Sequence, residues 1–159
     1  MTEGKLFYPV IEEVGSAFSA VLAELHGIAF APSARWQEKA FAELFATPGV
    51  TALLGSIDGT PVGFVLARSV ADEAEILTLA VSPSCQRRGV ARALMEKVMA
   101  LFAERKTERL FLEVSVNNRP AQALYTACGF TCAGTRKRYY EDGSDAEVMV
   151  RPISSSSEK

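Results

Sequence analysis

The sequence predicts a mixed α/β domain, and three observations support this class. The chain has 159 residues, of which 48% are hydrophobic, so one domain can bury a full core. Segments with apolar residues at helical spacing alternate with short, largely apolar segments that are typical of strands. No internal repeat or linker-like stretch divides the chain, so we expect a single domain over residues 1–153 and a disordered tail over residues 154–159.

The first half is predicted to contain two helices followed by a β-hairpin. Apolar residues recur at three-to-four spacing from Val10 to Leu25, which indicates an amphipathic helix, and residues 35–46 show a second pattern of this kind. Both helices are expected before any strand. Residues 50–57 and 61–69 are strand-like segments around the Asp58–Thr60 turn, whose glycine favours a tight connection.

The second half is predicted to alternate strands and helices. Residues 73–81 are largely apolar, which is typical of a strand covered on both faces, and helical spacing resumes from Val90 to Arg105. Asn118 followed by Pro120 is a cap-and-first-turn signal for the next helix, which Gly129 ends. The other predicted elements are a strand over residues 108–116, that helix over residues 121–128, and strands over residues 130–140 and 145–153 around an Asp142–Gly143 turn.

The overall charge excludes a protein that binds nucleic acid or membranes through its general electrostatics. Seventeen Lys and Arg residues against nineteen Asp and Glu residues give a net charge of −2, so any basic site must be local. No apolar run approaches the roughly 18 residues that a membrane-spanning helix needs. The N-terminus lacks the basic and apolar regions of a signal peptide, so we expect a cytoplasmic protein.

The cysteines predict neither a disulfide framework nor a metal site. Cys85, Cys128 and Cys132 are odd in number and match no usual zinc spacing, and His26 is the only histidine. We therefore expect reduced thiols and no bound metal. Cys85 or Cys128 as an acyl-accepting nucleophile is disfavoured, because no histidine lies near either in the sequence.

The segment 82–94, SPSCQRRGVARAL, has the composition of an anion site where a strand passes into a helix. The first turn of a helix leaves backbone N–H groups unpaired, so it can bind a phosphate without a dedicated side chain. Gly89 and Ala91 lack bulk and would let a phosphate approach this backbone. Positive charge comes from Arg87, Arg88 and Arg92. The alternative is a solvated basic turn.

Three segments together resemble the GNAT family of acetyl-CoA-dependent N-acetyltransferases: residues 77–95, 110–130 and 136–150. The family's acyl-CoA signature, Q/R-x-x-G-x-G/A, is matched by residues 86–91 with the alanine option. The resemblance is clear from about Glu75 to Val150 and is thin before that segment.

This resemblance implies a fold and a cofactor. The central sheet is expected to be mixed and mostly antiparallel, with one parallel pair of strands splayed around acetyl-CoA and helices on both faces. The backbone of Leu79, Ala80 and Val81 would hold the acetyl group and the pantetheine arm, and Asn118 would hydrogen-bond that arm. The pyrophosphate-binding segment would comprise Gln86, Arg87, Arg88, Gly89, Val90, Ala91 and Arg92.

The resemblance also assigns Glu113 as general base and Tyr125 as general acid. Acetyl transfer from a thioester requires an unprotonated nitrogen, and a carboxylate can take the proton directly or through water. The leaving thiolate needs a proton, which a phenol still carries at pH 7 because its reference pKa is about 10. Without the resemblance, Glu113 could equally be a salt-bridged strand residue and Tyr125 an ordinary core aromatic.

The expected activity is therefore acetylation of a protein N-terminal α-amine, and the motifs are most similar to the branch that modifies the N-terminal alanine of a ribosomal protein. Trp36 and the segment Arg136–Tyr140 could border the acceptor groove. A small-molecule amine or a lysine remains an alternative acceptor, since the cofactor motifs do not read the acceptor. A non-catalytic acetyl-CoA-binding module is a further alternative. We expect no nucleic-acid or membrane partner, and the sequence leaves the oligomeric state open.

Overall fold

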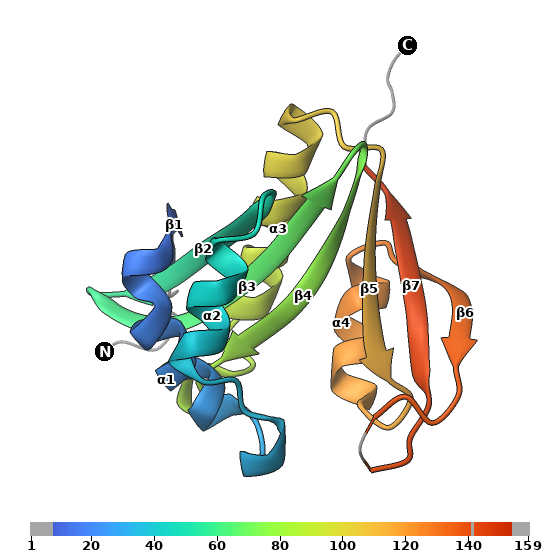
Figure 1. The fold of residues 1–159 in the computed structure, drawn as a ribbon, viewed down its shortest axis with the longest axis horizontal. Helices are drawn as coiled ribbons and strands as arrows, with labels where there is room; N and C mark the ends of the chain where they lie inside the picture. Colours follow the sequence, from blue (N-terminus) through green and yellow to red (C-terminus); the bar gives the residue numbers. More distant parts are fainter. Residues whose placement is uncertain (1–7, 141, 154–159) are drawn as a thin grey trace, which may run out of the picture.

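We describe the protein from a computed structural model that covers residues 8–140 and 142–153. Within these residues seven strands form one sheet in the order β1-β2-β3-β4-β5-β7-β6 (Figure 1). The strands are β1 (Val10–Val14), β2 (Val50–Ile57), β3 (Thr60–Val70), β4 (Glu73–Val81), β5 (Arg109–Ser115), β6 (Thr131–Arg136) and β7 (Ala146–Pro152). The predicted tail at residues 154–159 lies outside the described residues.

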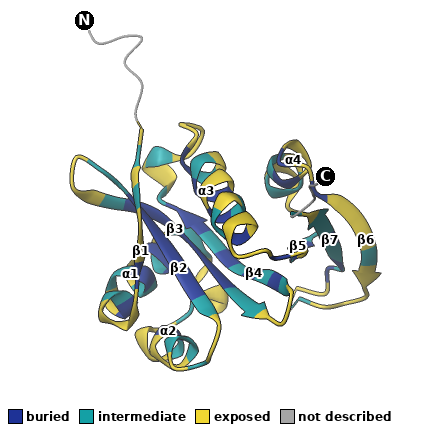
Figure 2. Ribbon diagram, turned by 90° about the horizontal axis from the view of Figure 1, so that it is seen from above, coloured by how far each residue is buried: buried dark blue, intermediate teal, exposed yellow. Residues whose placement is uncertain are grey.

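Helices cover both faces of the sheet, as the resemblance implies. The helices are α1 (Ser19–Ala29), α2 (Glu38–Phe45), α3 (Val90–Glu104) and α4 (Arg119–Ala127). Helices α1 and α2 pack on one face, and α3 and α4 pack on the other (Figure 2). The sheet therefore separates two hydrophobic cores. No helix in the described part of the chain combines the length and the apolar character needed to cross a membrane.

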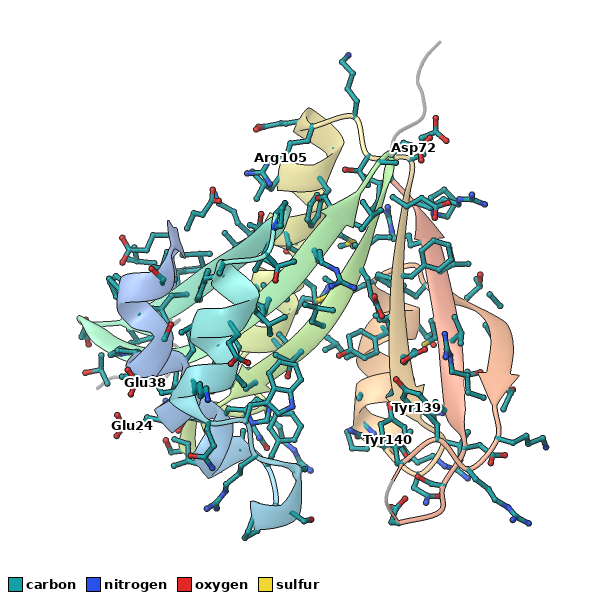
Figure 3. All side chains as sticks on the ribbon, in the orientation of Figure 1. Glu24, Glu38, Asp72, Arg105, Tyr139 and Tyr140 are labelled. Carbon is teal, nitrogen blue, oxygen red and sulfur yellow. The ribbon has the colours of Figure 1, made fainter. Side chains whose placement is uncertain are left out.

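Strands β4 and β5 form the sheet's parallel pair, and they meet over a short distance. The register joins Glu73 to Arg109, Ala74 to Leu110 and Glu75 to Phe111, after which the strands diverge (Figure 1). Arg109 forms an ion pair with Glu73 across this contact. We call the end where β4 and β5 are paired the closed end, and Asp72, which directly precedes β4, marks it in Figure 3. The splayed parallel pair implied by the resemblance is therefore confirmed.

Most predicted elements are confirmed close to their predicted bounds. Strands β2 and β4 span the predicted residues, and α3 ends one residue before the predicted Arg105. Asp58 and Gly59 both have positive φ angles, which is the conformation that a two-residue hairpin turn requires. Asn118 caps α4 by accepting a hydrogen bond from the Ala121 N–H at 3.2 Å.

The prediction of a helix from Val10 to Leu25 is wrong for its first part. Residues Val10–Val14 form β1, which pairs antiparallel with β2, and α1 begins only at Ser19. The apolar residues of this segment fit both periodicities because it is so short. As a strand, this segment forms its backbone hydrogen bonds with the open edge of β2. As a short isolated helix, it would have to form them within itself, which is marginal at this length. The sheet thus overrides the helical pattern, and a strand precedes both helices.

The prediction of a strand over residues 130–140 is also wrong at its end. Strand β6 stops at Arg136, and Lys137–Tyr140 form a turn and bend. Arg138 has a φ angle of +50°, and its backbone N–H donates to the Asp145 carboxylate at 2.9 Å. The Asp145 carboxylate thus accepts the backbone hydrogen bond that a neighbouring strand would accept if β6 continued. The two tyrosines of this segment are therefore presented by a loop, which frees them from the alternation of a strand.

The connection between α1 and α2 is built around His26, which is only 1% exposed. Its Nδ1 accepts a hydrogen bond from the Trp36 backbone N–H at 3.2 Å, and its ring stacks on Phe30 and Trp36 with centroid distances of 4.2 and 5.1 Å. Burial lowers the pKa of His26 to about 4. A neutral imidazole is required here, because a protonated Nδ1 could not accept the bond.

We predict that His26 makes the protein less stable in acid. The pKa of His26 in the folded chain is lower than the ordinary histidine value of 6.5. The contribution of the neutral imidazole to the free energy of unfolding is therefore fully present above about pH 6.5. It is lost as the pH falls toward 4, and the total change is at most about 3 kcal/mol of unfolding free energy. Denaturant unfolding of the wild type and of His26→Phe between pH 4 and 7 should show a flatter pH dependence for the variant.

His26 is the only histidine, so NMR offers a direct check on the same protein. Its imidazole should stay neutral well below pH 6 in the folded state. An imidazole that titrates near pH 6.5, or identical pH slopes for the two proteins, would contradict the prediction.

Candidate active site

The loop after β4 is anchored to the sheet and then turns sharply into α3. The Gln86 side chain donates from Nε2 to the Val81 carbonyl at 3.2 Å, and the Ser82 N–H donates to the Val62 carbonyl at 2.8 Å. Arg87 and Gly89 both adopt left-handed backbone conformations, with φ angles of +67° and +83°. Such turns make successive N–H groups converge into a concavity that binds anions.

The turn at residues 87–89, which we call the cradle, is open on its outer side. Gly89 is the N-cap of α3, and a Cβ atom added to it would meet no atom within 4 Å. The chain itself therefore leaves room where a phosphate would approach the backbone. This geometry fits the pyrophosphate of acetyl-CoA.

The predicted pyrophosphate-binding residues differ in whether their side chains are buried or exposed. Val90 is buried in the core, and Ala91 packs against it. Arg92 lies along α3 and pairs with Glu96 at 3.1 Å, and both side chains are at least half exposed. Arg87 and Arg88 are exposed. The cradle is thus made of backbone, and these side chains add charge around it.

Residues Leu79, Ala80 and Val81 lie on the part of β4 that has separated from β5. They pair with β3 on one side only, and the register shift in β3 leaves Leu77 of β4 without a partner there. A strand edge of this kind presents backbone groups to a ligand. Both α3 and α4 begin at the end of the sheet where β4 and β5 are furthest apart (Figure 1). Asn118, the N-cap of α4, therefore lies at the same opening, and its Oδ1 accepts the capping hydrogen bond from the Ala121 N–H.

Glu113 lies on β5 and faces the side of the sheet that carries α1 and α2, because Leu112 and Val114 point into the opposite core. Its side chain is 15% exposed and forms an ion pair with Arg136, with 2.5 Å between Oε2 and the guanidinium Nε. The Tyr139 hydroxyl also bonds to Glu113, and this bond followed by the carboxylate's charge raises the pKa of Tyr139. Figure 3 places Tyr139 and Tyr140 beside β5.

Tyr125 lies on α4 at the other face of the sheet, where its ring packs edge-on against Phe130. It is 8% exposed. Burial raises the pKa of Tyr125, and the neighbouring Cys128 and Tyr140 raise it further. The phenol therefore keeps its proton throughout the neutral range, which is the state that a proton donor needs.

Glu113 and Tyr125 are not in contact, and Tyr140 interacts electrostatically with both. Burial raises the pKa of Tyr140 to about 12, with further contributions from Glu113 and Tyr139. The rings of Tyr139 and Tyr140 are 5.1 Å apart, and both tyrosines interact with Glu113.

A cavity of about 320 Å³ opens beside Glu113 on the face of the sheet that carries α1 and α2. Its charged lining comprises Arg68, Glu73, Glu75, Glu113 and Arg136. The first three come from β3 and β4, which sequence reasoning did not connect with the site. The sequence predicted both strands but not their pairing, which places Arg68 of β3 opposite Glu75 of β4. Trp36 lines a separate shallow pocket on α2.

The described residues contain no group of three or more His, Cys, Asp or Glu side chains placed to hold a metal ion. Cys128 is buried and Cys132 is exposed, and neither forms a disulfide in the described part of the chain. The polar groups that the candidate site presents are a carboxylate, phenols, guanidinium groups and backbone N–H groups.

Comparison with known proteins identifies close relatives. Residues 19–130 match the family model described as the acetyltransferase (GNAT) family. The ribosomal protein bS18-alanine N-acetyltransferase of Escherichia coli is 38% identical over 122 residues, which cover 75% of this chain and 82% of that protein. The N-alpha-acetyltransferase RimI of Mycobacterium tuberculosis is 35% identical over 134 residues, covering 81% of this chain and 83% of the other.

The fold shows the same relationship. The crystal structure of the ribosomal-protein-S18-alanine N-acetyltransferase from Escherichia coli aligns with a TM-score of 0.87 and 32% identity. The alignment covers 96% of this chain and 98% of that chain.

We predict that Gly89→Val weakens acetyl-CoA binding about tenfold or more, whereas Arg92→Ala weakens it only a few-fold. Valine would fill the open space above the cradle and resist the positive φ angle. Arg92 is an exposed charge already paired with Glu96, so its loss should matter little. Calorimetric titration of both variants measures the difference, and circular dichroism checks that both are folded. Equal, unchanged affinities in two folded variants would make the segment a plain helix cap.

Proposed function

The chain belongs to the acetyltransferase (GNAT) family and is an acetyl-CoA-dependent N-acetyltransferase, and we propose that its acceptor is the N-terminal α-amine of a protein, in particular the N-terminal alanine of a ribosomal protein. The observation that carries this proposal is the similarity to enzymes named for that reaction, which extends over three quarters of the chain. The cavity beside Glu113 supports it, because it provides a mostly buried carboxylate for one amine.

The cofactor half of the site follows from the geometry of the backbone. We assign the pyrophosphate to the N–H groups of the turn at residues 87–89, where two left-handed residues aim them together. The free edge of β4 at Leu79–Val81 would hold the acetyl group and the pantetheine arm, with the Asn118 amide on the opposite side of the gap. When bound, acetyl-CoA supplies an acetyl group activated as a thioester.

Glu113 and Tyr125 have complementary roles in this proposal. Glu113 accepts a proton from the acceptor nitrogen, directly or through water, as the nitrogen attacks the thioester carbon. Tyr125 donates a proton to the sulfur as the carbon–sulfur bond breaks, and its raised pKa keeps that proton in place until then. Solvent exchange then returns one proton to Tyr125 and removes one from Glu113. Holding both reactants in one gap supplies several kcal/mol of the rate enhancement.

The protonation of the acceptor favours an α-amine over a lysine. An α-amine has a reference pKa near 8 and a lysine near 10.4, so at pH 7 about a tenth of the former is neutral but well under a thousandth of the latter. The difference is about 3 kcal/mol, which the site would have to supply for a lysine in addition to its normal task. A non-catalytic acetyl-CoA-binding module is disfavoured because both a carboxylate and a protonated phenol are in place.

We predict that a peptide beginning Ala-Arg is acetylated at its N-terminus, whereas its N-terminally blocked counterpart carrying a lysine is not. Mass spectrometry after incubation with enzyme and acetyl-CoA reports the site of modification. Glu113→Gln should lose most activity near pH 7 and recover part of it toward pH 9, as the free amine deprotonates by itself. Preferential lysine modification, or a wild-type rate for Glu113→Gln at pH 7, would refute the assignment.

We predict that Tyr125→Phe lowers kcat by roughly 10- to 10⁴-fold with little change in acetyl-CoA affinity. The substitution removes the proton but keeps the ring that packs on Phe130. Because the pKa of Tyr125 is raised, the wild-type rate should show no decline from loss of this proton up to about pH 9.5. Steady-state kinetics and cofactor titration separate the two effects. Wild-type turnover in the variant would make Tyr125 a packing residue.

A further inference from the structure

Arg136 reaches Glu113 across the intervening strand β7. Glu113 is paired with Val148 of β7, and Val148 is paired with Gly134 of β6, so these three residues form one row on one face of the sheet. Arg136 is two residues beyond Gly134 on the same strand and face. Gly134 has no side chain to block the path, and a Cβ atom there would meet nothing within 4 Å. The arginine arm therefore crosses β7 to the carboxylate.

The guanidinium of Arg136 is held by two partners. It contacts the Glu113 carboxylate at 2.5 Å, and it lies over the ring of Tyr139 at 5.4 Å from the centroid. Tyr139 itself bonds to the same carboxylate through its hydroxyl. A cation over an aromatic ring is held independently of the ion pair. The charge of Arg136 is thus kept beside Glu113 even when another group approaches that carboxylate.

On the basis of the proposed function, we propose that Arg136 is a positioning residue that makes the site select the neutral form of the acceptor amine. The carboxylate that receives the amine already carries a paired cation. A second cation, the acceptor's ammonium, would add an unbalanced positive charge to a partly buried site, whereas a neutral amine would not. The ammonium therefore gives its first proton to solvent on entering.

The Glu113 carboxylate is the acceptor for the second proton. As the nitrogen–carbon bond forms, one N–H bond breaks and its proton passes to a carboxylate oxygen of Glu113. Without Arg136, the lone carboxylate would instead hold the ammonium as an ion pair. That complex would be tight and unreactive at neutral pH, because the nitrogen lone pair is occupied by a proton.

Other charged groups around the carboxylate do not replace this role. The cavity lining brings Glu75 from β4 and Arg68 from β3, which are cross-strand neighbours of opposite charge. Glu73 is paired with Arg109. Tyr139 and Tyr140 face Glu113 from the loop after β6, and both have raised pKa values, so they are neutral at working pH. Arg136 is the cation in direct contact with Glu113 among the described residues.

The test measures kcat and KM for the N-terminal peptide from pH 6 to 9.5 in four variants: Arg136→Gln, Arg136→Lys, Lys97→Gln and Glu113→Gln. Arg136→Gln should lower kcat about tenfold at pH 7 and lower KM with it, and the midpoint of the kcat profile should rise by about one pH unit. Arg136→Lys keeps the charge and should stay near the wild-type midpoint. Lys97→Gln removes an exposed charge from α3, on the face of the sheet opposite Glu113, and serves as the control.

A merely structural role for Arg136 would give a different pattern. In that case Arg136→Gln would raise KM and lower kcat at every pH with an unmoved midpoint, and this result, or behaviour equal to Lys97→Gln, overturns the inference. The double variant Glu113→Gln/Arg136→Gln should behave like Glu113→Gln alone, because no carboxylate remains to trap the ammonium. If Glu113→Gln is fully active at pH 7, the proposed function fails instead, whatever Arg136→Gln does.

Discussion

The short parallel contact between β4 and β5 is the constraint on which the rest of the structure depends. Three residue pairs and one ion pair join the strands at the closed end, and antiparallel partners on their outer sides hold each strand in place. The two halves of the sheet can therefore diverge without either losing its own ladder. The divergence leaves the end of β4 with an open edge, brings the first turns of α3 and α4 to one opening, and exposes Glu113 beside a cavity. One geometric feature thus shapes both sides of the candidate site.

The two faces of the sheet have different chemical characters at this gap. On the side of α3 and α4, Tyr125 is buried among apolar side chains, and burial is the leading cause of its raised pKa. On the other side, Glu113 is surrounded by charged and hydroxyl groups. Tyr140 interacts with both Tyr125 and Glu113. The proposed proton donor and the proposed proton acceptor therefore lie in separate environments on opposite faces of the sheet, which is how opposite proton tasks can be performed at one pH.

Local patterns predicted the elements whose surroundings are uniform. Strands β2 and β4 and helix α3 have continuous apolar or helical patterns, and their bounds agree closely with those in the structure. The errors fall at β1 and at the end of β6, which are edge strands. Pairing on one side only makes an edge strand depend on its neighbour and on local side-chain acceptors such as Asp145, which the pattern of its own residues does not reveal. The site divides in the same way: the Asn118 cap is local and was predicted, whereas the contact between Glu113 and Arg136 depends on β7 lying between β5 and β6.

In the proposed site, the cofactor and the acceptor are therefore recognised by different means. The turn at residues 87–89 would bind through backbone N–H groups, whose directions are fixed by φ angles, so the surrounding arginine side chains could change without destroying the cradle. The acceptor side would use charged side chains from β3, β4, β5 and β6, and a change in any of them would alter the charge that the acceptor meets. A ligand that never varies suits the first kind of recognition. An acceptor whose protonation state decides its reactivity suits the second, because only side chains can set the local charge beside Glu113 independently of the fold.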